Sequence, residues 1–525
     1  MLNAVREVAE FVLPRPADAR ARGDGVPQIS GSRYRIASAG QSRTVRRIWL
    51  DTFDWRLFRA GLSLEYTAAR GNRELVLTAR DGELIAEQSM SADRPRWPAK
   101  IEQLPVGPLR EHLSGVIGVR ALLPVVRATS VQTNRRAFDA ENKTIAIVTT
   151  EQTTLTEPAK ATTPSRVAVA PLRGYQAQAG KLAGALARVP GVQRADHTAF
   201  EATLRAAGRR PGDYTSKIDV RLSGDMPAAL AICTVLIRLF GTAEANVPGA
   251  IRDIDTEFLH DLRIAVRRTR SVLKLTGSAL PAGLADRYRP EFKWLGDLTT
   301  PTRDLDVYLI GYPSMAGKLI AATEPELRPF HDYLATQRTT AQRRLARGLR
   351  SARFAGLARE WQRDLKQIAE GPRRRPPAGK FAAERIRRAH TRVLRSGGAI
   401  DASSPPQALH DLRKTCKELR YLLEVFASLH DPGEQWRAVN ELKALQDCLG
   451  EFQDTEVQQT ELRAFARKMV AEVRAPAETL LAMGEIAAGL AVRQRAARSE
   501  FAGLFATFAS ARGRARIDAL TMAAL

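Results

Sequence analysis

The sequence predicts a multidomain fold in which an N-terminal α+β region with an antiparallel sheet precedes an all-α region made of two copies. Two observations predict this order. Short segments rich in β-branched residues fill the first 220 residues, and long amphipathic helical patterns follow from about residue 226. The tetrapeptide HDLR then occurs twice, at 260–263 and 150 residues later at 410–413, which indicates an internal duplication.

The N-terminal region predicts a mostly antiparallel sheet that can close into a barrel, because its apolar segments are short and some are separated by Gly and Asn. ARGNRE at 69–74 is such a separator. We expect strands at 63–68, 74–80, 144–150 and 166–170, helices at 108–113 and 175–188, and a loop at 152–165.

The remainder predicts amphipathic helices, several with a proline near the start, where a missing N–H is tolerated. The expected helices are 227–241, 256–277, 284–298, 302–310, 324–370, 380–396, 405–428, 433–450, 453–474 and 476–511. EGPRRRPPAGK at 370–380 separates the copies, and its Arg373–Arg375 run is interpreted as a solvated linker. The domain boundaries are therefore predicted as 1–220 and 226–512, with halves at about 226–370 and 380–512.

The segment HDLRIAVRRTRSVLKL at 260–275 predicts a helix with a coherent cationic face. At about 100° per residue, its basic side chains share an arc of about 80° that borders the apolar face. A solvated face would lie opposite the core and mix both signs of charge, so this arrangement indicates the wall of a groove that needs an anion. The residues of this face are His260, Arg263, Arg267, Arg270 and Lys274.

The second copy repeats the face 150 residues later with His410, Arg413, Lys417 and Arg420. A second landmark keeps the same offset, LGDLTTPTRDLDVYL at 295–309 against LQDCLGEFQDTEVQQ at 445–459. The copies differ, since Lys274 maps to Glu424 and Arg303 to Gln453. A solvated face, or histidines that cap neighbouring helices, remain alternatives. The carboxylates of the second landmark favour helix capping and salt bridges over a metal site; they are Asp297, Asp304, Asp306, Asp447, Asp454 and Glu456.

Composition indicates a polyanionic partner and a reducing compartment. The net charge is +24, which makes an acidic partner plausible. Cys233, Cys416 and Cys448 have no metal or redox spacing, and we find neither a secretory signal nor a run of about 18 apolar residues, so we expect a cytoplasmic protein with no membrane partner. Aromatic residues are 6% of the chain, which disfavours nucleic acid because single-strand binders stack bases on aromatics.

The two HDLR openings, the basic helix after each, RDLDV at 303–307 and LQDCLG at 445–450 resemble the CHAD family, the conserved-histidine α-helical domain, over roughly 226–512. The resemblance implies two four-helix bundles around a basic channel that binds inorganic polyphosphate, with possible recruitment to polyphosphate granules. It carries the binding role to the two cationic faces and to Arg303. Polyphosphate has charges and no bases, and the first face spans about 21 Å, enough for several successive phosphates.

WLDTFDWRLFRAGLSL at 49–64 resembles the CYTH family of triphosphate tunnel enzymes, which implies that the sheet is a tunnel-like β-barrel. The family's metal-binding carboxylates and phosphate-binding cations are replaced here, with Arg6, Val8 and Glu10 at one motif and Glu65 and Thr67 at another. We therefore expect a degenerate tunnel with no catalytic residue, metal or cofactor, in which Arg59, Arg80 and Arg135 are candidate surviving cations. A metal-dependent triphosphatase or cyclase with an accessory helical domain, and a nucleic-acid-binding scaffold, are the alternatives.

Overall fold

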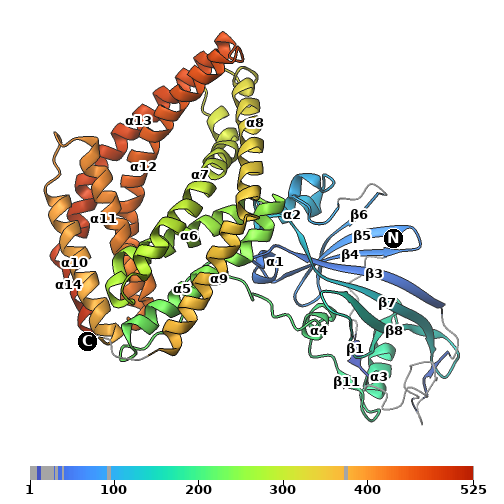
Figure 1. Cartoon of the computed structure of the whole chain (residues 1–525). Helices are drawn as coiled ribbons and strands as arrows, with labels where there is room; N and C mark the ends of the chain where they lie inside the picture. Colours follow the sequence, from blue (N-terminus) through green and yellow to red (C-terminus); the bar gives the residue numbers. More distant parts are fainter. Residues whose placement is uncertain are drawn as a thin grey trace. The chain divides into compact units, whose positions relative to one another are not determined.

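The computed structural model describes residues 9–13, 29, 33–37, 41–91, 96–371 and 376–523, and the chain divides into two compact units (Figure 1). Met1–Thr215 is called the sheet unit below and Ser216–Leu525 the helical unit. The predicted boundary near residues 220–226 lies a few residues after this division. Arg6, Val8 and the Arg373–Arg375 run lie outside the described residues.

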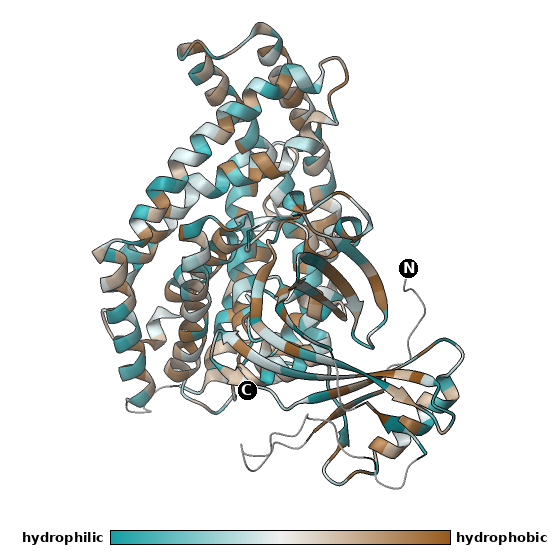
Figure 2. Ribbon diagram, turned by 90° about the vertical axis from the view of Figure 1, so that its right-hand side faces the viewer, coloured by the Kyte–Doolittle hydropathy of each residue, from teal (hydrophilic) through white to brown (hydrophobic). Residues whose placement is uncertain are grey.

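The sheet unit is one antiparallel sheet with strand order β11-β1-β10-β8-β7-β3-β4-β5-β6, which confirms the predicted class. Figure 2 shows hydrophobic and hydrophilic residues alternating along its strands. The short strands β2 and β9 pair with β7 and β8, and within the described residues the end strands β11 and β6 do not pair. The strands are β1 Ala9–Val12, β2 Arg35–Ile36, β3 Gln41–Asp51, β4 Leu62–Ala69, β5 Asn72–Ala79, β6 Leu84–Ser89, β7 Leu123–Phe138, β8 Thr144–Glu157, β9 Ala161–Thr162, β10 Arg166–Pro171 and β11 Gln193–Arg194.

Two sequence predictions in this unit are wrong. The expected loop at 152–165 is largely strand, since β8 continues to Glu157 and its threonines pair with β7; β-branched residues suit a pleated strand. Arg135 is not in the tunnel interior. It lies on the same face of β7 as Ala137, which packs in the hydrophobic cluster under α3, whereas Ser130 lies on the other face.

Short helices cover the sheet and close its cores. They are α1 Arg56–Arg59, α2 Pro108–Ile117, α3 Gln176–Leu186 and α4 Ala199–Ala206. Leu109 and Leu113 of α2 pack against Leu64 and Leu75 of β4 and β5. Phe200 of α4 packs against Trp49 of β3. Strand β3 therefore forms one wall of this hydrophobic core.

The helical unit consists of ten long helices in the described residues, four of which recur in the same order in each copy. The equivalent pairs are α5 and α10, α6 and α11, α7 and α12, and α8 and α13. This confirms the predicted duplicated four-helix architecture. The helices are α5 Ala228–Arg252, α6 Thr256–Thr276, α7 Leu284–Ala316, α8 Glu324–Leu349, α9 Ala352–Glu370, α10 Ala378–Gly398, α11 Pro406–Val425, α12 Pro432–Ala471, α13 Ala477–Phe508 and α14 Ala511–Ala523.

The two copies are related by a pseudo-two-fold axis, which a pair of matched backbone hydrogen bonds defines. The Ala228 N–H donates to the Pro376 carbonyl (3.0 Å), and the Ala378 N–H donates to the Met226 carbonyl (2.8 Å). Adding 150 to Ala228 and to Met226 gives Ala378 and Pro376, so one bond is the symmetry mate of the other. The copies therefore face one another about an axis near Pro227 and Pro377, which form an isolated bridge.

Helix boundaries were predicted less well than helix existence. α7 runs unbroken through Pro301 and α12 is one helix of 40 residues, although each was predicted as two. A proline distorts a helix without ending it where packing holds both sides. The predicted helix 324–370 is two helices, because α8 ends at Leu349 and Ser351 caps α9 by accepting from the Phe354 N–H.

One helix, α5, is long and apolar enough to cross a membrane by length and composition alone. The sequence alone predicts no run of about 18 apolar residues, and Arg238 interrupts the apolar sequence of this helix. Within the unit, 61% of its most apolar window is buried against other helices. Ile232, Val235 and Leu236 are fully buried, so core packing accounts for its hydropathy.

We expect Gly249→Ala to lower the free energy of unfolding by about 1–3 kcal/mol. A Cβ at Gly249 would lie 2.2 Å from Phe258 Cδ1, so α5 and α6 would have to separate. Urea denaturation followed by circular dichroism measures the change. Gly241→Ala is the matched control in the same helix, because its Cβ would meet no atom within 4 Å. That variant should be neutral or gain up to about 1 kcal/mol, and equal effects of the two changes would contradict this packing.

Candidate functional site

The first cationic face belongs to α6, which starts where the Asp255 carboxylate accepts from the Glu257 and Phe258 N–H groups. Leu262 and Val266 are buried on the core side of the helix. The predicted basic residues lie beside that buried stripe, so they share one face. His260 and Arg263 are half-buried, and Arg267, Arg270 and Lys274 are exposed.

The second face belongs to α11 and has the same relation to its core. Leu412, Cys416 and Leu419 are buried, and burial raises the pKa of the Cys416 thiol to about 12. The four predicted residues of this copy, His410, Arg413, Lys417 and Arg420, are all half-buried.

One arginine in each copy is braced by the following helix. Arg263 donates to Thr300 Oγ1 and lies 3.8 Å from Asp304. Arg413, its equivalent, donates to Gln453 (2.8 Å) and to Asp454 (3.0 Å). Asp304 and Asp454 therefore brace the arginines of the two cationic faces and do not cap helices.

A second pair of equivalent arginines keeps the same relation to α7 and α12. The Arg270 guanidinium lies over Gly296, where a Cβ would come within 2.9 Å of its Nη1. Arg420 donates to Gln446 Oε1 (3.0 Å), and residue 446 is the equivalent of 296. A glycine at 296 lets the arginine approach the helix backbone, whereas a glutamine at 446 binds it through a side chain.

Cations of the two copies meet across the pseudo-two-fold axis. Arg267 and Lys417 occupy equivalent positions, and they interact electrostatically with one another. Burial, followed by Arg413, Arg267 and Arg420, lowers the pKa of Lys417 from its ordinary value of 10.5 to about 8. Asp454 opposes this shift and does not cancel it.

The first copy shows the same crowding of positive charge. Burial lowers the pKa of the Arg263 guanidinium, and Arg267, Arg303 and Arg270 lower it further against the opposing effect of Asp304. The Arg303 Nη1 nitrogen is buried and has no hydrogen-bond partner among the residues that the structure describes. Within the described residues four of these cations form no ion pair, namely Arg267, Arg270, Arg303 and Lys417. They and Arg263 and Arg413 are called the cationic cluster below.

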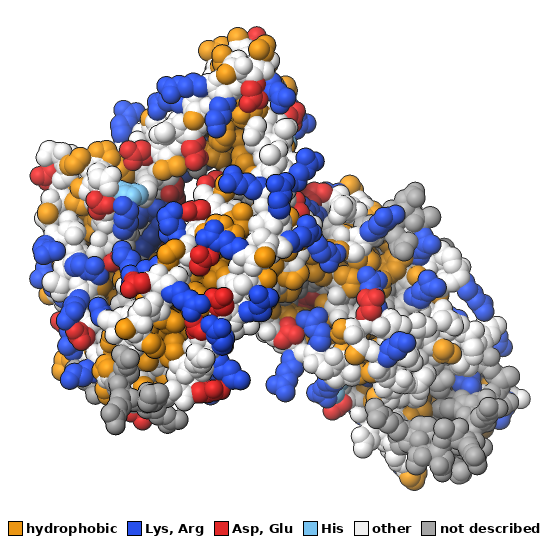
Figure 3. Space-filling model, in the orientation of Figure 1, with side chains coloured by type: hydrophobic (Ala, Val, Ile, Leu, Met, Phe, Trp, Pro, Cys, Tyr) orange, Lys and Arg blue, Asp and Glu red, His pale blue; other side chains and the backbone are white. Residues whose placement is uncertain are grey.

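Lys274 differs from the rest of the predicted set, because its ammonium contacts Glu418 of α11 at 2.6 Å. Its charge is balanced by the other copy. The other predicted cations lie close enough to interact electrostatically, Arg263 with Arg267, Arg270 and Arg303, and Lys417 with Arg267, Arg413 and Arg420. Figure 3 shows Lys and Arg side chains gathered in a hollowed part of the surface over α11 and α6, where the two copies meet.

Two of the remaining landmark carboxylates, Asp306 and Asp297, bind other side chains. The Asp306 carboxylate is 1% exposed and accepts from Arg338 at 2.8 Å, and Asp297 pairs with Lys293 at 2.6 Å. In the part of the chain that the structure describes, no group of three or more His, Cys, Asp or Glu side chains could hold a metal ion.

The sheet unit contains a cavity of about 1540 Å³. Arg47, at its wall, is paired with both Glu65 and Glu151. Burial opposes the charge of Arg47, but the two carboxylates together raise its pKa. Arg166 is paired with Glu10 in the same cavity. The buried cations here are thus neutralised by the unit's own carboxylates.

The candidate surviving cations of the tunnel are dispersed. Arg80 lines the cavity and stacks over Phe58 at 4.3 Å. Arg59 donates to the Tyr214 carbonyl at 3.1 Å.

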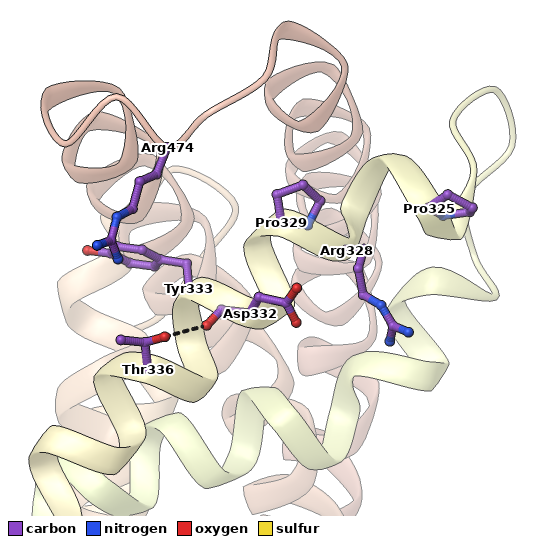
Figure 4. A pocket seen from close by; sticks show the side chains of 7 residues that line it. All are labelled: Pro325, Arg328, Pro329, Asp332, Tyr333, Thr336 and Arg474. Carbon is purple, nitrogen blue, oxygen red and sulfur yellow. Dashed lines mark hydrogen bonds between the residues drawn. The ribbon is translucent and has the colours of Figure 1, made fainter.

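A second, smaller pocket of about 390 Å³ lies on α8 and beside Arg474 (Figure 4). Figure 4 shows the Arg474 guanidinium next to the Tyr333 ring, and the Thr336 hydroxyl donates to the Asp332 carbonyl at 2.9 Å. Its lining mixes both signs of charge, so it lacks the uniform charge of the cationic cluster.

Fold and site together define a two-part protein whose duplicated helical unit concentrates cations about its pseudo-two-fold axis. Residues 234–463 match the family model of the CHAD domain. The chain therefore contains a CHAD domain, as the HDLR repeats predicted.

Solved structures are similar to each part of the chain. The CHAD domain of the plant Ricinus communis is 24% identical over 55% of this chain and 96% of that one, with a TM-score of 0.48. PptA from Streptomyces chartreusis is 19% identical over 53% and 96%, with a TM-score of 0.40. A candidate adenylyl cyclase from Hippeastrum, described as having a dominant triphosphatase activity, is 14% identical over 40% and 99%, with a TM-score of 0.28. None of the curated proteins compared matches the sequence.

We expect Lys417→Met to stabilise the ligand-free protein at pH 7. The pKa of Lys417 in the folded protein, about 8, is below its ordinary value, so folding disfavours the protonated form. This cost is fully present below about pH 8 and disappears as the pH rises toward 10.5. Denaturant unfolding at pH 7 and at pH 10 should therefore show a gain that shrinks with pH. Lys414→Met, an exposed position on the same helix, is the control, and a gain that is constant with pH would contradict the crowding of charge.

Proposed function

We propose that the helical unit binds inorganic polyphosphate through the cationic cluster, together with His260 and His410. The observation that carries the proposal is the position of Arg267 and Lys417, equivalent residues that repel one another across the axis and form no ion pair in the described part of the chain. Such an arrangement is costly unless an anion lies between the copies. A cytoplasmic location with attachment to polyphosphate granules follows from this proposal.

The chemistry of the cluster favours a chain of phosphates over a single anion. Guanidinium groups from α6 and α11 approach one hollow from two sides, and each can donate paired hydrogen bonds to phosphate oxygens. Several phosphates in succession would satisfy both copies at once, whereas one phosphate would leave most of the charge unbalanced.

Nucleic acid fits the cluster less well. Base stacking needs aromatic surfaces, each worth about 1–3 kcal/mol per base. The aromatic residue nearest to the two faces in sequence is Tyr421, on α11. RNA could also bind through its phosphates alone, so the binding experiment must distinguish RNA from polyphosphate as the ligand.

The alternative, a metal-dependent triphosphatase in the sheet unit, would use the cavity described above. Its buried arginines are already occupied by Glu65, Glu151 and Glu10, so a triphosphate would have to displace these carboxylates. We therefore place polyphosphate binding first. An assay for Mg²⁺-dependent phosphate release from tripolyphosphate tests the alternative, and turnover abolished by a chelator would establish it.

We expect Arg267→Gln with Lys417→Gln to weaken polyphosphate binding about 100-fold, because two charge-assisted contacts of about 1.5 kcal/mol or more each are lost. The salt dependence of the affinity should become shallower at the same time. Isothermal titration with polyphosphates of defined length measures both.

The matched control is Arg359→Gln with Arg495→Gln, which removes two exposed cations, one from α9 and one from α13. This variant should bind within about twofold of the wild type. Equal losses in both variants would show that net charge and not the cluster binds the ligand. Single-stranded RNA that competes with polyphosphate at equal charge and fixed salt would overturn the choice of ligand.

A further inference from the structure

The contact between α6 and α11 is held by two ion pairs that are symmetry mates. Arg268 pairs with Glu424 at 3.0 Å, and Lys274 pairs with Glu418 at 2.6 Å. In each helix the earlier of the two residues meets the later residue of the other helix, so the helices run in opposite directions where they cross. Because 268 and 418 are equivalent positions, as are 274 and 424, the same contact is made twice about the axis.

The charges at these two positions are reversed between the copies. The first copy carries a cation at both, Arg268 and Lys274, and the second carries a carboxylate at both, Glu418 and Glu424. A duplication begins with identical residues at equivalent positions, so the two copies have since diverged at these positions. The present faces fit only each other.

Three of the four side chains are largely buried, which makes a mismatch costly. Arg268 and Glu424 are each 18% exposed and Glu418 is 14% exposed, whereas Lys274 is 69% exposed. Glu418 also forms an ion pair with Arg392 at 3.0 Å, and Glu424 forms one with Arg420 at 2.7 Å. Like charges at this distance and with this little exposure to solvent repel strongly.

We propose that these four residues restrict the α6 face of the N-terminal repeat to one class of partner, the acidic α11 face of the C-terminal repeat. Pairing between two first copies, from two molecules, would put Arg268 against Lys274 twice. Pairing between two second copies would put Glu418 against Glu424 twice. Repulsion of this kind excludes wrong partners more than it strengthens the right one. Each N-terminal repeat therefore pairs with a C-terminal repeat and not with another N-terminal repeat.

A one-pair swap isolates this effect. Arg268→Glu with Glu424→Arg keeps both ion pairs within the molecule but gives each copy one residue of each sign. Same-copy pairing between molecules then becomes favourable, because residue 268 of one first copy would attract residue 274 of another. The reference is a full swap, in which Arg268→Glu, Lys274→Glu, Glu418→Arg and Glu424→Lys restore complementary copies with opposite sign.

The three proteins, wild type, one-pair swap and full swap, are refolded from denaturant over a range of protein concentrations and their masses measured by light scattering. We expect the one-pair swap to form a several-fold larger share of dimers and higher species than the other two. The same distribution for all three would overturn the proposal. The measurement uses no phosphate ligand, so its outcome is independent of the proposed binding function.

A fourth variant shows whether the pairs matter to the fold at all. Arg268→Glu with Lys274→Glu makes both faces acidic, and we expect its Tm to fall by about 5–10 °C relative to the wild type. The full swap should recover most of that loss. An unchanged Tm in the acidic variant would remove the energetic basis of the proposal.

Discussion

Where α6 and α11 cross, two pairs of opposite charges attract each other, and like charges lie next to them. The helical unit depends on the balance between this attraction and this repulsion. Arg268–Glu424 and Lys274–Glu418 attract across the axis. Arg267, the neighbour of Arg268, is thereby brought toward Lys417, where the interaction is repulsive. The attractive pairs therefore offset part of the repulsion within the cluster in the folded, ligand-free protein.

Duplication explains why the site forms where it does. At a two-fold axis a residue meets its own equivalent, so a single basic position in an ancestral helix yields two facing cations without any further change. The backbone bonds of Ala228 and Ala378 have stayed matched, because they do not depend on side chains. The side-chain contacts could diverge, and at positions 268 and 418 and at positions 274 and 424 the charges now differ in sign. The bracing of Arg263 and Arg413 by the following helix is the same in both copies.

The sequence predicted the helical unit well because its signals are local or repeated. Helical periodicity, the HDLR openings and the fixed offset were enough to place His260 through Arg270 and His410 through Arg420 on two matching faces. The roles of Arg268 and Lys274 required a partner in another helix, which periodicity does not show, although the sign reversal at 418 and 424 was visible as a signal. Helix ends at Leu349 and across Pro301 were predicted incorrectly because capping and packing, not composition, decided them. Arg135 was misplaced because a residue's face in a strand depends on its register.

The two units treat buried positive charge in opposite ways, and the contrast bears on function. In the sheet unit Arg47 has two carboxylates of its own, Glu65 and Glu151, and all three side chains are less than 20% exposed. Desolvation is offset internally, so that cavity is stable without a ligand and has little free charge to offer one. In the helical unit Arg267 and Lys417 form no ion pair among the described residues, Asp454 offsets the charge of Lys417 only in part, and the cost appears in the lowered pKa of Lys417. An anion that enters there relieves repulsion already present, and its binding gains free energy that a neutralised site cannot supply.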